Sequence, residues 1–101
     1  MDIQNILQEM LNAMGAVLKT KWKTSKPVVE QLLERRRNSI QDLTDLWVAG
    51  KLTKEEYESR IDDEKHIWEA QLNVISAISK ATLQHAINAA IDILRNIKIK
   101  F

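Results

Sequence analysis

Apolar side chains recur in the first 19 residues at the spacing of one face of an α-helix. Three or four residues separate most of them, so they share an arc of roughly 140° on a helical wheel, and glutamines and asparagines lie outside it. The pattern predicts a helix over residues 2–19. We expect its apolar face to pack against the last part of the chain, and it is also a candidate surface for a protein partner. The apolar residues are Ile3, Ile6, Leu7, Met10, Leu11, Met14, Val17 and Leu18.

A polar, basic stretch, TKWKTSK, follows at positions 20–26. It ends at Pro27, and proline is favoured in the first turn of a helix. Ser25 has a side chain typical of a helix N-cap. The sequence therefore predicts a basic linker over residues 20–26 and a second helix over residues 27–48, which Gly50 ends.

Thr53 and Glu56 form the sequence signature of a capping box, which predicts the start of a third helix. No glycine or proline follows, so the pattern predicts one long helix over residues 54–98. At about 1.5 Å per residue this helix would span on the order of 65 Å. The alternative is a break near Ser76 or Ser79 that lets a single chain fold back into a compact bundle.

The second predicted helix has about half the length of the third. An antiparallel hairpin of the two therefore leaves the C-terminal half of the third helix uncovered, although that half carries an apolar stripe about 180° wide. We predict an all-α helical bundle, one domain over residues 1–101, that a second copy completes as a homodimer. The predicted dimer interface contains Ile75, Ile78, Leu83, Ile87, Ala90, Leu94 and Ile97.

Two charged residues interrupt the apolar stripes of the predicted hairpin. If Trp47 of the second helix meets Tyr57 of the third, the apolar residues of both helices match in antiparallel register. Arg36 and Glu64 then lie one layer apart inside the contact. Because a lone buried charge is strongly destabilising, we predict that they form an ion pair, within one chain or across the dimer.

Composition supports the helical interpretation and limits the possible chemistry. The chain has 101 residues, 45% hydrophobic and 29% charged, with two glycines and one proline, which is typical of helical proteins. The absence of cysteine excludes disulfides and thiolate metal sites. No apolar run reaches the roughly 18 residues of a transmembrane helix, so we expect no membrane-spanning segment and a cytoplasmic location.

Asp62, His66 and Glu69 are the candidate metal ligands. Their spacing of three and four residues places them on one face of a helix. That face is turned away from the apolar stripe, so we interpret it as a solvated acidic surface. A metal-binding bundle of the di-iron type remains the alternative function.

Nucleic acid and membrane surfaces are the other partners to weigh. Lysines on both sides of Trp22, within residues 19–26, are residue types that contact phosphates and stack on a base. The net charge is only +1, and acidic residues face the arginines at 35–37, so we do not expect nucleic-acid binding. The first helix has an apolar face for a membrane surface, but its polar face lacks the basic residues usual in interfacial helices.

Residues for catalysis are not recognisable in this chain. It has no cysteine nucleophile, no glycine-rich phosphate loop and no zinc-binding histidine pair. We therefore expect a non-enzymatic protein without a cofactor. Its predicted role is that of a structural, adaptor or regulatory subunit that acts through helix–helix contacts.

Overall fold

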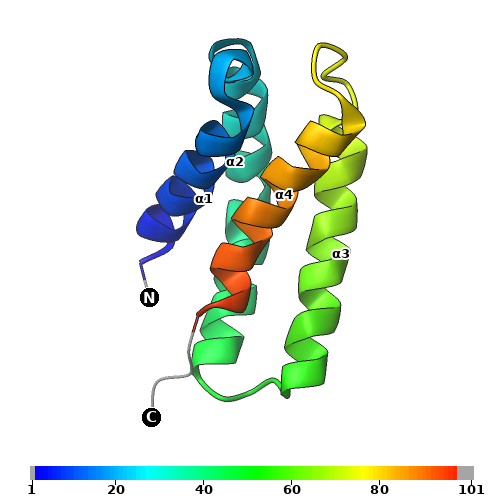
Figure 1. The fold of residues 1–101 in the computed structure, drawn as a ribbon. Coiled ribbons are helices and arrows are strands. Elements are labelled where there is room, and N and C mark those ends of the chain that lie inside the picture. Colours follow the sequence, from blue (N-terminus) through cyan, green and yellow to red (C-terminus); the bar gives the residue numbers. More distant parts are fainter. Residues whose placement is uncertain (1, 98–101) are drawn as a thin grey trace.

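The computed structural model describes residues 2–97, and these residues form four α-helices and no β-strand. The helices run alternately up and down the long axis (Figure 1). The all-α bundle predicted from the sequence is confirmed. The helices are α1 (Ile3–Leu18), α2 (Trp22–Val48), α3 (Lys54–Leu72) and α4 (Lys80–Arg95), and a short 3₁₀ turn, η1 (Lys19–Lys21), joins the first two.

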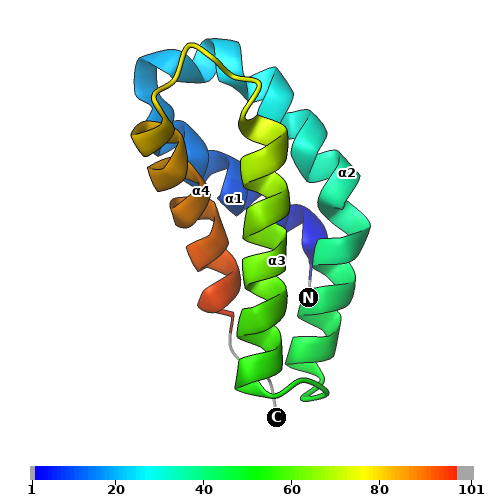
Figure 2. The same ribbon diagram turned by 90° about the vertical axis from the view of Figure 1, so that its right-hand side faces the viewer.

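The four helices form a ring around one hydrophobic core. Each helix packs against the two beside it, and the most extensive packing joins α1 to α4. Seen from the side, α3 lies in front between α4 and α2, with α1 behind it (Figure 2). Every helix contributes fully buried side chains, among them Met10, Met14, Val29, Ile40, Ile61, Trp68, Ile91 and Leu94.

The basic linker predicted over residues 20–26 is wrong, because these residues are almost entirely helical. The turn η1 leads directly into α2, which begins at Trp22 and not at the predicted residue 27. The change of direction is concentrated at Lys19, whose φ of 49° and ψ of −114° end α1. The second helix is therefore longer than expected and reaches over the end of the bundle.

Pro27 lies inside α2 and not in its first turn. Because proline has no N–H, the carbonyl of Lys23 loses its usual helical partner, but Lys23 is exposed and water can satisfy that carbonyl. The Ser25 hydroxyl donates a hydrogen bond to the carbonyl of Lys21 at 2.7 Å. Ser25 therefore bonds back into the preceding turn and is not the predicted N-cap.

The single long helix predicted over residues 54–98 is also wrong, and its last residue lies outside the described residues. Residues 73–79 separate α3 from α4. Ser79 is the N-cap of α4, where its hydroxyl oxygen accepts a hydrogen bond from the backbone N–H of Thr82 at 3.2 Å. This is the alternative break near Ser79, and the cap stabilises the new helix start without help from glycine or proline.

The break lets α4 fold back between α1 and α3, and this buries the residues of the predicted dimer interface within one chain. Six of its seven residues are buried inside the single chain, and the remaining one, Ile75, is half-buried. The chain's own helices cover the stripe, so these residues belong to the core of one chain, and an interface between copies at this stripe stays a prediction. The buried six are Ile78, Leu83, Ile87, Ala90, Leu94 and Ile97.

The start of α3 has the predicted capping box. The Thr53 hydroxyl accepts from the Glu56 N–H at 3.1 Å, and the Glu56 carboxylate accepts from the Thr53 N–H at 2.9 Å. The backbone hydrogen bond from Thr53 lowers the pKa of Glu56. Gly50, with a φ of 72°, makes the turn from α2 toward this cap.

The aromatic pair at this end of the hairpin has the predicted register. The rings of Trp47 and Tyr57 stack with centroids 4.3 Å apart and planes 4° from parallel. Trp47 Nε1 donates to the carbonyl of Ile97 at 2.7 Å, and the Tyr57 hydroxyl donates to the carbonyl of Leu94 at 2.6 Å. Both bonds reach the C-terminal end of α4, so the α2–α3 hairpin also holds the last turn of the bundle.

Candidate functional site

The structure brings Arg36 and Glu64 together in a charged layer of the core. Arg36 Nε donates to Glu64 Oε1 at 2.7 Å, and Nη2 donates to Oε2 at 2.9 Å. This is the bidentate geometry that makes arginine–carboxylate pairs strong and directional. The Glu64 side chain is only 6% exposed, whereas that of Arg36 is 22% exposed. Helix α3 therefore supplies a buried anion and α2 a cation that still reaches solvent.

Trp68 completes this layer from the next turn of α3. Its indole Nε1 donates to Glu64 Oε1 at 3.2 Å, and its ring is fully buried. The hydrogen bond to Glu64 raises the pKa of Arg36 against the opposing effect of burial. With three donors on one carboxylate, the layer is suited to holding two helices in register and leaves little capacity for acid–base chemistry on a substrate.

The candidate metal ligands have different partners. Asp62 accepts from Arg95 at 3.5 Å, Glu69 accepts from the side-chain amide of Gln84 at 3.2 Å, and His66 is exposed. Within residues 2–97, no group of three or more His, Cys, Asp or Glu side chains could hold a metal ion. The structure thus places the three residues along one side of α3 without converging them on a common point.

Trp22 of the basic stretch packs against the protein. A Cβ atom added to Gly15 would lie 2.9 Å from the Trp22 ring, so the indole rests directly on the backbone of α1. Trp22 is half-buried, while the lysines on both sides of it are exposed. Stacking of a nucleic-acid base on this ring, considered from the sequence, loses its geometric basis. The absence of a side chain at position 15, seven residues before the tryptophan, was the available sequence signal.

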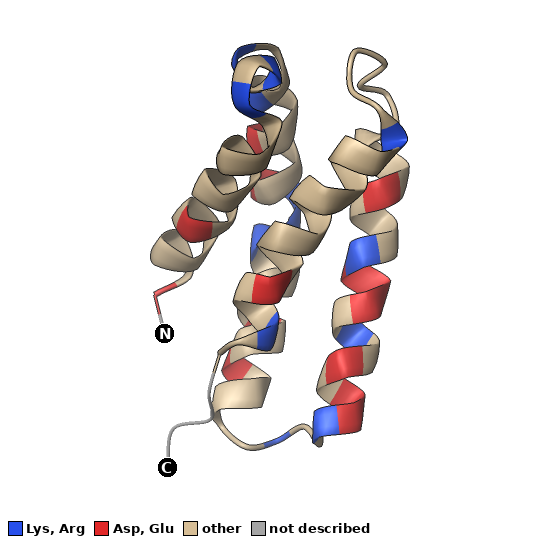
Figure 3. Cartoon of the chain, viewed as in Figure 1, with Lys and Arg blue, Asp and Glu red and all other residues tan. Residues whose placement is uncertain are grey.

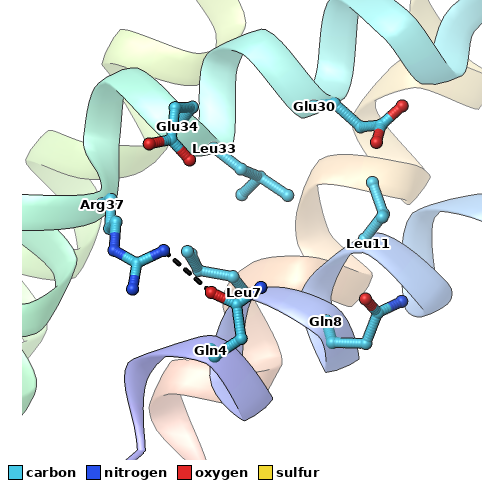
Figure 4. A pocket seen from close by; sticks show the side chains of 8 residues that line it. All are labelled: Gln4, Leu7, Gln8, Leu11, Glu30, Leu33, Glu34 and Arg37. Carbon is cyan, nitrogen blue, oxygen red and sulfur yellow. Dashed lines mark hydrogen bonds between the residues drawn. The ribbon is translucent and has the colours of Figure 1, made fainter.

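A groove lies between α1 and α2 on the side of the bundle (Figure 4). Leucines from both helices point into the space between them and form an apolar floor. Polar side chains of α1 line one wall, and charged side chains of α2 line the other. The lining residues are Gln4, Leu7, Gln8, Leu11, Glu30, Leu33, Glu34 and Arg37.

The walls of this α1–α2 groove are electrostatically unequal. Glu30 and Glu34 are exposed, lie one helical turn apart on α2 and form no ion pair with any residue of the described range 2–97. Arg37 Nη1 donates to the side-chain oxygen of Gln4 at 2.8 Å and so joins the two helices at one end. The groove has a volume of about 190 Å³, below the several hundred Å³ of typical small-molecule sites. It therefore fits one or two side chains of a docked segment.

Sequence periodicity alone did not reveal this groove. It places Leu7, Leu11 and Leu33 on apolar faces, but it does not give the distance between the two helices that carry them. Comparison with known proteins gives no further guidance, because no family model, curated protein or solved structure matches this chain. Among the described residues, no helix has the length and apolar character needed to cross a membrane.

Proposed function

We propose that this protein is a non-enzymatic adaptor or regulatory subunit that binds a helical segment of a protein partner in the α1–α2 groove. One observation carries the proposal, namely the apolar floor of leucines bordered along one wall by the carboxylates of Glu30 and Glu34. Docking of an amphipathic helix into an apolar groove is a common mode of peptide recognition. The small volume favours side chains presented by a macromolecule over a free metabolite.

The charges of the groove define the chemistry of the partner. Glu30 and Glu34 are four residues apart, so their carboxylates lie on one helix face at a spacing of about one turn. A partner helix with an apolar side chain for the floor and two Lys or Arg residues one turn apart complements this wall. Gln4 and Gln8 on the opposite wall offer amide groups that can donate or accept.

A designed peptide tests the proposal directly. The probe is an amphipathic helix with a leucine seam flanked by lysines, labelled for fluorescence anisotropy, and the reference peptide has glutamates in place of the lysines. We expect saturable binding of the lysine peptide alone. The variant E30K/E34K should weaken binding by at least about tenfold, because two attractive contacts become repulsive.

The matched control is D42K/D45K, which makes the same change in net charge at two exposed positions of the same helix. It should leave the affinity for the lysine peptide within about twofold of the unmodified protein. An equal loss of affinity in both variants would show unspecific attraction between charges. That result, or failure of the lysine peptide to bind, would overturn the proposal.

The homodimer expected from the sequence stays a prediction with less support than before. The apolar stripe that motivated it is covered by α1 and α3, and the acidic wall of the α1–α2 groove does not complement a second copy of itself. Light scattering during size-exclusion chromatography measures the mass directly. A value near the 11.7 kDa of one chain would refute the dimer, and twice that value would establish it.

A further inference from the structure

Five lysines lie at one end of the bundle. Four belong to the α1–α2 turn and the first turns of α2, and the fifth begins α4, so that two connections far apart in sequence lie at the same end (Figures 1 and 3). All five side chains are exposed. We call this surface the basic end, and its lysines are Lys19, Lys21, Lys23, Lys26 and Lys80.

Neither connection of the basic end contains an acidic residue, although Glu69 of α3 lines a pocket together with Lys80. Residues 10–29 and 70–91, which form both connections and the adjoining helix turns, contain neither aspartate nor glutamate. Of the 15 Lys and Arg residues, five lie here, and the other ten share the rest of the chain with all 14 Asp and Glu. A net charge of +1 therefore hides a strongly polarised molecule with one positive end.

An apolar side chain is exposed at the same end. Val74, in the connection between α3 and α4, is 74% exposed and is the exposed large hydrophobic residue of the described chain. Beside it, Val28 and Leu32 of α2 and Leu72 of α3 line an open groove together with Arg35. Val74 and the half-buried Val28 thus give the basic end a small apolar surface beside its charges.

We propose that the basic end docks the protein on an anionic lipid bilayer, with the lysines against the headgroups and Val74 in the interfacial layer. The positive charges are spread over two separate connections across one end of the bundle, which suits a flat, negatively charged surface. The groove beside Val74 gives acyl chains or headgroup carbons an apolar contact. This inference is independent of the α1–α2 groove, whose residues take no part in it.

Nucleic acid shares the negative charge but fits the basic end less well. Recognition of a single strand uses aromatic rings on which bases stack, and Trp22, the aromatic residue of this end, lies on the backbone at Gly15. An exposed valine contributes nothing to phosphate contacts. Lipid accounts for both Val74 and the lysines, whereas nucleic acid accounts for the lysines alone.

Vesicle flotation with the intact protein tests the inference. The probes are vesicles of phosphatidylcholine with phosphatidylserine and vesicles of phosphatidylcholine alone. We expect binding to the anionic vesicles, weakened by added salt, and little binding to the neutral ones. Each lysine near such a surface should change the partition constant roughly fivefold, so K21Q/K23Q should lower it about 25-fold.

Two further variants separate this docking from a general charge effect. K51Q/K54Q removes two exposed lysines from the opposite end and should leave vesicle binding within about twofold of the unmodified protein. V74S keeps every charge and should weaken binding several-fold, since the apolar contact is lost.

The results that would overturn the inference are equally definite. Absence of binding to the anionic vesicles, or equal losses for the two lysine pairs, would refute docking through the basic end. Salt-sensitive binding of a single-stranded oligonucleotide that exceeds vesicle binding, and that V74S leaves unchanged, would replace lipid by nucleic acid as the ligand.

Discussion

Removing one partner of the Arg36–Glu64 pair should destabilise the protein far more than removing both. In the variant R36M, the carboxylate of Glu64 stays buried at 6% exposure. It loses both donors of Arg36 and keeps the indole N–H of Trp68. In E64L, the guanidinium of Arg36 loses its acceptor but keeps contact with water, since it is 22% exposed. R36M is therefore the more severe single change.

The geometry gives the size of these effects. Breaking a buried pair costs about 3–5 kcal/mol in general, and partial exposure of Arg36 places E64L near the lower limit, about 3 kcal/mol. In R36M the carboxylate of Glu64 stays buried without its cation, which places this variant near the upper limit, about 5 kcal/mol.

The double variant R36M/E64L replaces the pair by apolar side chains and should lie within about 1 kcal/mol of the unmodified protein. Urea unfolding followed by circular dichroism at pH 7 measures all four proteins and gives the coupling energy of the pair. A loss of 3 kcal/mol also lowers the melting temperature by more than about 10 °C in a domain of this size.

Two outcomes would refute this reasoning. If both single variants unfold within about 0.5 kcal/mol of the unmodified protein, the pair is not part of the core in solution. If the double variant loses as much as the sum of the two single changes, the residues act separately and the coupling is absent.

Two other changes probe contacts at opposite ends of the bundle. Y57F removes the hydrogen bond to the Leu94 carbonyl and should cost about 1–2 kcal/mol in urea unfolding. Because burial raises the pKa of Tyr57, unfolded tyrosine ionises first above about pH 10, so the unmodified protein should lose stability there more steeply than Y57F, and parallel pH profiles would contradict this. G15A should destabilise by about 1 kcal/mol or more, because the new methyl group meets the Trp22 ring at 2.9 Å. In a W22L background the same change should stabilise by up to about 1 kcal/mol, and a stabilising G15A in the unmodified protein would refute the contact.

Local signals and hairpin register were predictable from the sequence. The capping box at Thr53 depends on two residues three positions apart, and the stack of Trp47 on Tyr57 follows from matching two apolar stripes. The placement of Arg36 beside Glu64 follows from the same register. Each of these depends on residues close in sequence or on one pair of helices around one turn.

The breaks and the open surfaces depended on interactions that span the whole chain. Residues 73–79 contain no glycine or proline, and the apolar pattern continues on both sides. The chain turns there because the wide stripe of α4 gains two partner helices, α1 and α3, by folding back. Conversely, residues 20–26 are helical despite Pro27, because packing of Trp22 on Gly15 favours an early start of α2. In both places the free energy gained by tertiary packing outweighs the local helix propensity, and no short sequence pattern reveals it.

The close packing of α1 against α4 has a consequence for how the protein assembles. These two helices share the most extensive contact of the bundle, yet residues 19–79 lie between them. The α2–α3 hairpin closes a short loop and can form early. The contact between α1 and α4 closes a long loop, and its formation therefore costs more conformational entropy. We therefore expect the ring to close last where α1 meets α4, and formation of this contact should limit the folding rate.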